Sequence, residues 1–481
     1  MTPLDFFKKI SSIPRGSGNE KGIADYIEAI AIEHGLYCVR DTENNVFVRK
    51  SASKCRQDKP TVLFTAHTDM VCEKLPSSTH NFENDSIELI EKEGFLFANG
   101  TTLGADDGAG VAAMLSLMTD EALIAPETEY LFTSGEETGM YGAFAFDYSE
   151  IKSSLAVNLD NGAECSACIG CASGKRFETK IPLERTRKCG KAVKITVGGL
   201  KGGHSGTEIA NGGQSAIKLL AHLLDSIYSD YPFHIVSLFG GGKDNVIPAS
   251  ASATVIFYGS GDEKNAKEKA SDFEKQIRKT LNKEDAKKFK VSFSKLKQLE
   301  NDTACDMLTL KSTSSVISAL ILSPQGVLKM IPDTDMVLSS VNLGIVQTES
   351  SFLRICHLAR SASKTAATLT DQALKRLSHA LGGSVSTVSE YPGWEYRRGS
   401  RLQDVYTEAC AEIYGHEPSF YAVHAGLECG ILYEKLESLG KAPDIIAIGP
   451  NMSDIHSPKE KLETASLDRL DKTLRAILLK V

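Results

Sequence analysis

The sequence predicts an α/β fold of two domains, in which a second domain interrupts the first. Three observations predict it. At 481 residues the chain exceeds what one hydrophobic core usually supports. In its outer parts, short apolar runs alternate with helical patterns, which is typical of a sheet flanked by helices. Its middle carries glycine-rich loops, strand-like runs and a long charged helical stretch, which indicates an α+β insertion. We predict an α/β domain from residues 1–174 and 389–481, and an inserted α+β domain from residues 175–388.

The elements of the outer domain follow from local patterns. Residues 17–20 (SGNE) have the spacing of a capping box, and the apolar face that follows them predicts a helix ending at Gly35. The stretch GVAAMLSLM (110–118) predicts a second helix. In the inserted domain, residues 262–289 are rich in charge and predict helix. Four short apolar runs predict buried strands: TVLFTA (61–66), EYLFT (129–133), LAVNL (155–159) and DIIAIG (444–449).

Charge and cysteine content exclude several classes of function. A net charge of −8 gives no basic surface for nucleic acid and no attraction to anionic lipid. There is no run of about 18 apolar residues to span a membrane and no secretory signal, so we expect a cytosolic protein. Eleven scattered cysteines fit reduced thiols. Cys165, Cys168 and Cys171 have the spacing of an iron–sulfur motif, but Lys175 stands where its fourth cysteine belongs, and the role of this cluster stays open.

Side chains that bind metals follow each of the four predicted strands. In an open α/β sheet, ligands bind outside the carboxyl ends of the strands, so we expect these side chains to meet there. A further acidic pair lies on a glycine-flanked turn before the second helix, in LGADDGAG. The residues, in chain order, are His67 and Asp69, Asp106 and Asp107 of the turn, Glu136 and Glu137, Asp160, and His456.

Each of these groups also has an ordinary explanation. The histidine and its neighbouring aspartate form a common surface or capping pair, the paired aspartates can cap a helix, and adjacent glutamates are usually solvated. Together, however, so many acidic and imidazole groups at one sheet edge would repel one another without cations. Histidine and carboxylate ligands without cysteine favour zinc, manganese or cobalt at an enzyme site. Their number exceeds the three protein ligands that one open site needs, which predicts two divalent metal ions.

The adjacent glutamates can then have separate roles. If Glu137 binds a metal, Glu136 need not, and it remains as a free carboxylate beside a water that bridges the metals. Such a carboxylate can take the proton of the water and later give it to a leaving amine.

These motifs resemble those of the M20 metallopeptidase superfamily, most closely its aminoacyl-histidine dipeptidase (Xaa-His dipeptidase) branch. The resemblance covers nearly the whole chain. Its motifs, in chain order, are HTDMVCEK, TTLGADDGAG, TSGEETGMYGA, NLDN, GGLKGGHSG, NVIP, HAGLECG and GPNMSDIHSP. The last two, HAGLECG and GPNMSDIHSP, are specific to the branch. It implies a zinc-peptidase-like catalytic domain with a central mixed sheet flanked by helices, and an inserted domain that closes over the site and contributes to a homodimer.

The resemblance also implies roles for the candidate residues. Glu136 would be the general base and acid, and Asp69 would orient the imidazole of His67. A cis peptide bond would join Asp106 and Asp107. One zinc would bind His67, Asp106 and Asp160, and the other would bind Asp106, Glu137 and His456, with Asp106 bridging.

In the inserted domain, the resemblance implies three residues that contact the substrate. His204 of GGHSG would stabilise the oxyanion, while Asn245 of NVIP and Arg360 of LARSAS would hold the peptide end and the carboxylate. A histidine on a glycine loop, or an arginine at the surface, remains an alternative for His204 and Arg360. The chain departs from the family by lacking a basic residue in NGGQSA, where Gly213 and Ser215 stand, and by Ala249 after NVIP, so substrate preference stays open.

The sequence therefore predicts a cytosolic metal-dependent dipeptidase that hydrolyses unblocked dipeptides, with Xaa-His substrates such as β-alanyl-histidine as the leading candidates. Two alternatives remain. The chain could be an amidohydrolase of the same superfamily that deacylates N-acyl amino acids, or a metal-binding relative without catalysis. Nucleophile-based hydrolysis has no support, because no G-x-S-x-G motif occurs.

Overall fold

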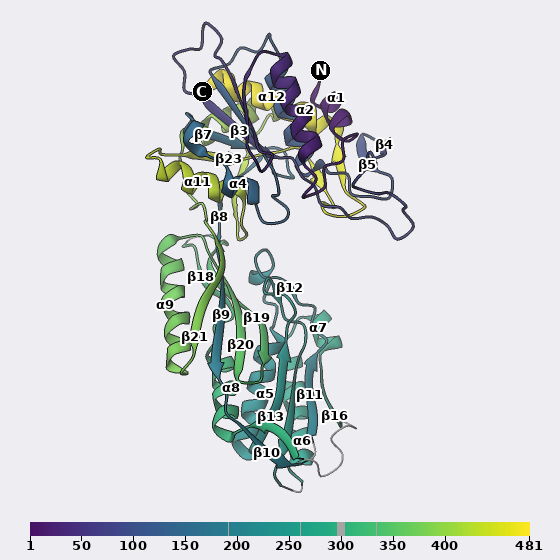
Figure 1. Cartoon of the computed structure of the whole chain (residues 1–481), viewed down its shortest axis with the longest axis vertical. Coiled ribbons are helices and arrows are strands. Elements are labelled where there is room, and N and C mark those ends of the chain that lie inside the picture. Colours follow the sequence, from purple (N-terminus) through teal and green to yellow (C-terminus); the bar gives the residue numbers. More distant parts are fainter. Residues whose placement is uncertain (191, 260, 296–303, 333) are drawn as a thin grey trace. The chain divides into compact units, whose positions relative to one another are not determined.

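The computed structural model describes residues 1–190, 192–259, 261–295, 304–332 and 334–481 (Figure 1). Residues 191, 260, 296–303 and 333 of the predicted insertion lie outside this described part. The chain divides into two compact units. Unit 1 comprises Met1–Cys171, Trp394–Ala422 and Leu427–Val481. Unit 2 comprises Ala172–Gly393 and the short segment Val423–Gly426. Each unit is built around its own sheet, and the predicted α/β fold class with an α+β insertion is confirmed.

Unit 1 contains an eight-stranded mixed sheet whose centre is formed by the four predicted strands. β6, β3, β7 and β23 are neighbours in that order and run parallel to one another, so their carboxyl ends share one edge. The outer pairs β1–β2, β2–β6 and β23–β8 are antiparallel. The sheet order is β1 (Tyr37–Arg40), β2 (Val46–Lys50), β6 (Thr128–Thr133), β3 (Val62–His67), β7 (Leu155–Asn158), β23 (Asp444–Ala447), β8 (Ser166–Cys171) and β22 (Ser419–Val423).

Helices cover this sheet, and α3 is packed directly against β3. The core strands β3 and β6 are buried along their whole length, as expected for strands with helices on their faces. A small antiparallel sheet joins β4 (Leu89–Lys92), β5 (Phe95–Ala98), β25 (Lys461–Glu463) and β24 (Met452–Ser453). The helices are α1 (Pro3–Ile10), α2 (Lys21–Glu33), α3 (Ala105–Thr119), α4 (Tyr141–Ala145), α10 (Arg401–Tyr414), α11 (Glu428–Ser438) and α12 (Thr464–Lys480), with a 3-10 turn at Tyr148–Glu150.

The capping box predicted for the first helical pattern was wrong, and a helix that the sequence patterns did not predict precedes it. This helix is α1, whose capping box pairs Thr2 with Asp5. The capping box predicted at residues 17–20 does not form, because α2 begins after Glu20 without a side-chain cap. The Glu20 carboxylate instead accepts the backbone N–H groups of Gly18 and Gly135, at 2.9 and 3.2 Å. A carboxylate expected to cap a helix therefore supports the loop that carries Glu136.

Unit 2 contains a nine-stranded antiparallel sheet with helices packed on it. Figure 1 shows α9 beside β21 and β9, which it contacts, while α5 packs on β11, β13 and β15. The sheet order is β16 (Lys290–Lys295), β11 (Ala192–Gly198), β15 (Ala251–Phe257), β13 (Phe233–Gly240), β19 (Val337–Thr348), β20 (Phe352–Ser361), β9 (Ser173–Pro182) and β21 (Ser384–Tyr391), and β18 (Gly326–Met330) also pairs with β19.

The remaining elements of unit 2 complete its core and carry its loops. The charged stretch predicted as helix forms α6 and α7. Two short antiparallel pairs, β10–β17 and β12–β14, lie outside the main sheet. The bounds are α5 (Ala216–Asp230), α6 (Asp262–Arg278), α7 (Lys283–Lys288), α8 (Leu310–Leu322) and α9 (Lys364–Ala380), with β10 (Arg185–Cys189), β12 (Gly203–His204), β14 (Val246–Ile247), β17 (Ala304–Leu308) and a 3-10 turn at Ile209–Asn211. Within the described part of the chain, no helix has the length and apolar character needed to cross a bilayer.

Candidate active site

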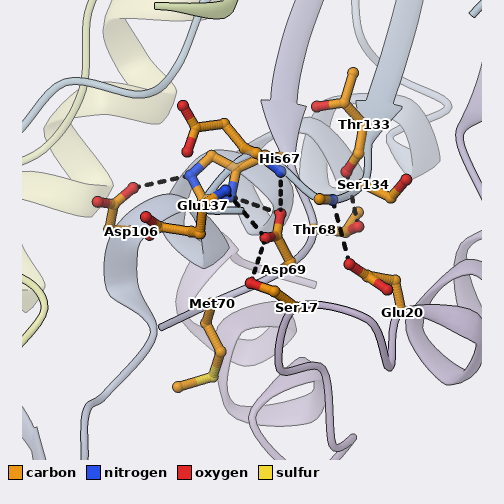
Figure 2. Close-up of polar contacts among 12 residues, drawn as sticks. Ser17, Glu20, His67, Thr68, Asp69, Met70, Asp106, Thr133, Ser134 and Glu137 are labelled. Carbon is orange, nitrogen blue, oxygen red and sulfur yellow. Dashed lines mark hydrogen bonds and ion pairs between the residues drawn. The ribbon is translucent and has the colours of Figure 1, made fainter. Parts of the chain in front are cut away.

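His67 is the last residue of β3, and its two ring nitrogens face two carboxylates. Nδ1 lies 3.3 Å from the Asp69 carboxylate, and Nε2 lies 3.0 Å from that of Asp106 (Figure 2). The His67 ring is buried, with 1% of its side chain exposed. The contact at Nδ1 fixes the orientation of the ring and leaves Nε2 directed at Asp106.

Asp69 connects His67 to the loop that carries the paired glutamates. Its carboxylate accepts the backbone N–H groups of Glu136 and Glu137 at 3.0 and 3.2 Å, and the hydroxyl of Ser17 at 2.7 Å. Burial alone would raise the pKa of Asp69, but its hydrogen bonds with His67 and Ser17 bring the pKa down to about 2. Asp69 therefore acts as an anion that orients His67 and holds the glutamate loop in place (Figure 2).

Asp106 lies between two imidazoles that come from opposite ends of the chain. One carboxylate oxygen is 3.0 Å from Nε2 of His67, and the other is 3.1 Å from Nε2 of His456. The same nitrogen of His456 lies 2.8 Å from the Glu137 carboxylate. His456 has a φ of 62°, which is uncommon for a residue other than glycine. The peptide bond between Asp106 and Asp107 is cis, as predicted.

Two further carboxylates lie in the same electrostatic environment. Asp160 follows the end of β7, and burial together with the Asp106 carboxylate raises its pKa well above the usual range. Burial, with a further contribution from the Glu137 carboxylate, raises the pKa of Glu136 to about 7. Direct contacts join His67, Asp69, Asp106, Glu137 and His456, and the pKa values of Asp160 and Glu136 respond to the charges of the same residues, so that the cluster has an excess of acidic groups.

The donor atoms of this cluster fit divalent cations. Ligand atoms of His67, Asp106 and Glu137 all lie within 4.8 Å of one another. Among the described residues, these three form the group of histidine, cysteine and acidic side chains that is close enough to hold a metal ion. Imidazole nitrogen and carboxylate oxygen are the donors that catalytic zinc, manganese and cobalt sites use. Cys165, Cys168 and Cys171 take no part in this group, and none of the three forms a disulfide bond. Cys168 and Cys171 lie in β8, and Cys165 directly precedes it.

The substrate-binding candidates of unit 2 form a cluster of their own around Gly206. A Cβ atom on Gly206 would lie 3.0 Å from Cε1 of His204 and 3.3 Å from Cζ of Arg360, so the glycine allows both side chains to approach. Asn245 is joined to this cluster through its backbone. Its backbone carbonyl accepts the N–H of Ser205 at 2.9 Å, which ties the NVIP loop to the GGHSG loop.

Comparison with known proteins agrees with this geometry. The model of Peptidase family M20/M25/M40 matches residues 63–480. The chain belongs to this peptidase family. It is therefore a hydrolase that acts on peptide bonds, and the resemblance seen in the sequence motifs is confirmed.

Two relatives of this M20 peptidase match it over almost the whole length. The cytosol non-specific dipeptidase of Escherichia coli (strain K12) is 31% identical over 480 residues, covering 99% of this chain and 97% of that protein. The aminoacylhistidine dipeptidase of Vibrio alginolyticus has a similar structure, with a TM-score of 0.89 and 29% identity, covering 100% of this chain and 96% of the other. The aminopeptidase PepT of Bacillus cereus shares the fold at a TM-score of 0.55 and 16% identity.

Sequence reasoning missed three residues of the unit 2 cluster in this M20 peptidase. His424 lies in the motif HAGLECG, and its Nε2 is 2.7 Å from the hydroxyl of Ser340. Arg360 donates from Nη1 to the hydroxyl of Tyr391 at 2.5 Å. Burial and the charge of Arg360 lower the pKa of His424 to about 4. The HAGLECG motif was a signal for His424, and the motif YPGW (391–394), which also belongs to the family resemblance, was a signal for Tyr391. Ser340 lies in ordinary strand sequence.

Proposed function

We propose that this M20 peptidase hydrolyses dipeptides with a free amino terminus, using two divalent cations, and that Xaa-His dipeptides such as β-alanyl-histidine are its leading substrates. The observation that carries the proposal is the Asp106 carboxylate, whose two oxygens each face a different imidazole at 3.0 and 3.1 Å. A carboxylate placed in this way is suited to bridge two cations. The similarity to dipeptidases supports the substrate class.

We assign the candidate ligands to two adjoining metal-binding positions. His67, Asp106 and Asp160 would hold one ion, and Asp106, Glu137 and His456 would hold the other. The donor set suits zinc, with cobalt or manganese as alternatives. When bound, such ions polarise the scissile carbonyl and favour ionisation of water.

Glu136 carries the proton in this proposal. It lies beside the cluster without being needed as a ligand, and its raised pKa of about 7 suits both uptake and release of a proton near neutral pH. Glu136 accepts a proton from the attacking water as the new carbon–oxygen bond forms. It then donates that proton to the amide nitrogen as the carbon–nitrogen bond breaks, so that an amine and a carboxylic acid leave. The acid then gives the second proton of the water to solvent and becomes a carboxylate.

Unit 2 supplies binding groups for the substrate. Arg360 is 6% exposed, and its Nε has no hydrogen-bond partner among the described residues, which leaves a buried donor for the substrate carboxylate. We assign His204 to the oxyanion and Asn245 to the peptide end. We also propose that the inserted domain predicted at residues 175–388, which lies within unit 2, serves as lid and as the contact between the subunits of a homodimer. The cytosolic location of the similar E. coli dipeptidase supports a cytoplasmic protein.

A substrate panel tests this proposal. The protein is stripped of metal with a chelator, reloaded with zinc, cobalt or manganese, and offered β-alanyl-histidine, other Xaa-His dipeptides, dipeptides without histidine, and their N-acetylated forms. We expect hydrolysis of the free-amine dipeptides after metal is restored. Hydrolysis of the acetylated forms alone would assign a deacylase instead, and no turnover with any metal would indicate a metal-binding relative without catalysis.

A further inference from the structure

Glu460 is a buried carboxylate that accepts four consecutive backbone N–H groups. Its Oε2 accepts from Leu103 and Gly104 at 2.8 and 3.0 Å, and its Oε1 accepts from Ala105 and Asp106 at 2.8 and 3.3 Å. Only 2% of the residue is exposed. These N–H groups precede the regular part of α3 and have no partner within the helix, so the carboxylate satisfies donors that would otherwise be buried unpaired.

The position of Glu460 in the chain gives this contact a particular consequence. It lies four residues after His456, in the segment that enters β25. The loop that Glu460 binds, residues 103–106, ends in Asp106, which is 350 residues from His456 in sequence. One side chain thus connects the loop that presents Asp106 to the segment that presents His456.

A buried arginine also holds the Asp106 loop. Arg15 donates to the carbonyl of Gly104, and to the carbonyls of Thr68 and Asp69 at 3.0 and 3.1 Å. Arg15 is also 2% exposed. The loop is therefore fixed by an anion on its N–H groups and by a cation on one of its carbonyls. The cation connects the loop to the end of β3 that carries His67.

We propose that Glu460 is a positioning residue that sets the spacing between Asp106 and His456 and so determines how tightly the second divalent cation is held. Neither ligand lies on a long regular element at its point of attachment, and His456 has a left-handed backbone. A carboxylate has two acceptor oxygens, and each receives two N–H groups here. No other side chain offers this arrangement at the same length. The inference rests on the proposed ligand set.

Unit 1 offers a matched control. Glu129 is a second buried carboxylate that accepts backbone N–H groups, from Lys152 at 2.9 Å and Ser153 at 3.0 Å, and it is 0% exposed. It lies near the start of β6, at the end opposite to the candidate ligands. Changing either glutamate to glutamine turns an amide N–H₂ toward backbone N–H donors. E129Q also gives up an ion pair with Nε of Arg49 at 3.3 Å, so the control loses at least the same kind of contact.

The experiment measures metal affinity apart from activity. Full-length wild-type protein, E460Q and E129Q are stripped of metal and titrated with Zn²⁺ by calorimetry and with Co²⁺ by visible absorption, and thermal unfolding of each metal-free protein is recorded. We expect E460Q to bind the weaker of the two ions about 10- to 100-fold less tightly than the wild type, the range found for groups that orient metal ligands. E129Q should bind both ions as the wild type does, although both variants unfold at lower temperature.

Several results would overturn the inference. Wild-type metal affinity in E460Q would overturn it, as would an equal loss of affinity in E129Q, which would show a general effect of destabilisation. If E460Q does not fold, E460D carries the test, because it keeps the charge but withdraws the oxygens from the loop. Wild-type affinity in E460D would then count against the inference. A wild-type protein that binds no Zn²⁺ or Co²⁺ would instead refute the proposed function itself.

Discussion

The two polar clusters of this M20 peptidase have opposite electrostatic character. The cluster of unit 1 gathers carboxylates around two imidazoles. Burial first, and neighbouring carboxylates after it, raise the pKa of Glu136 and of Asp160, whereas contacts with the imidazoles help to lower the pKa of Asp69 and of Asp106. The cluster of unit 2 gathers Arg360, His204 and His424, and the charge of Arg360 lowers the pKa of both histidines after burial has done so. The donor atoms of the first cluster suit cations, whereas the positive charge of the second suits the anion-binding role that we propose for it.

Replacing the proposed general base should give the largest effect. We expect E136Q to lower kcat about 10²- to 10⁴-fold, the usual contribution of a general acid or base. Because Glu136 is not among the proposed ligands, Zn²⁺ affinity should stay at the wild-type value. Amino acid release and metal titration on the same preparation measure the two quantities. If E136Q loses its metal together with its activity, Glu136 is a ligand, and the separation of roles between Glu136 and Glu137 is wrong.

The anion-binding character of unit 2 can be tested through the substrate. We expect R360Q to lower kcat/KM for a free dipeptide about 100-fold, because charge-assisted hydrogen bonds contribute about 1.5–3 kcal/mol. The same substitution should change kcat/KM very little for the corresponding dipeptide amide, which has no carboxylate to lose. Steady-state kinetics of the wild type and R360Q on both substrates give the interaction free energy between Arg360 and the substrate carboxylate. An equal loss on acid and amide would show that Arg360 supports the fold of unit 2 rather than the carboxylate.

The two clusters also differ in how far the sequence could predict them. His67, Asp160 and His456 follow parallel strands that are themselves recognisable, so a local pattern placed them at one edge of a sheet. His424 and Ser340 meet across 84 positions through a four-residue segment that belongs to unit 2 although its neighbours in sequence belong to unit 1. No periodic pattern in the sequence predicts a contact of this kind. The contact depends on the tertiary arrangement of the loops after the strands have paired.

The contacts that hold the ligand-bearing loops of unit 1 could not be predicted from the sequence, for the same reason. Glu20 was expected to close a capping box, but it accepts the N–H of Gly135 in the glutamate loop. Arg15 holds the Asp106 loop from more than 80 positions away in the chain, and Glu460 holds it from more than 350 positions away. A buried N–H without a helical or strand partner needs an acceptor. Which side chain supplies it is decided by tertiary structure, whereas the identity of the ligands is visible in the motifs.

The interior of unit 2 allows a test of its pH dependence. His357 is 1% exposed, and neither ring nitrogen has a hydrogen-bond partner within the described part of the chain. Burial, with a smaller contribution from Lys218, lowers its pKa to about 4. The unfolded chain therefore binds more protons than the folded chain as the pH falls from about 6.5 to 4, and stability is lost in that window.

We expect H357L to remove this loss, which for one such histidine is about 2 kcal/mol between pH 7 and pH 5. Urea unfolding followed by circular dichroism at the two pH values measures it. Changing the exposed His379 to glutamine provides the control and should leave the pH dependence unchanged. If H357L and the wild type lose stability equally on acidification, His357 is not the group whose protonation destabilises unit 2.

The smallest effect should come from the outermost contact of the unit 1 cluster. Ser17 donates to the Asp69 carboxylate at 2.7 Å, but Asp69 also contacts His67 and accepts the N–H groups of Glu136 and Glu137. S17A removes one hydrogen bond of about 1 kcal/mol, so zinc should bind about fivefold more weakly. D69N removes the anion itself and should weaken binding about 10- to 100-fold. Titration of both variants with Zn²⁺ gives the ratio of their two losses of zinc affinity. An effect of S17A as large as that of D69N would mean that Asp69 cannot keep its position without Ser17, and that the cation-binding cluster is held from its periphery rather than by the strand ends.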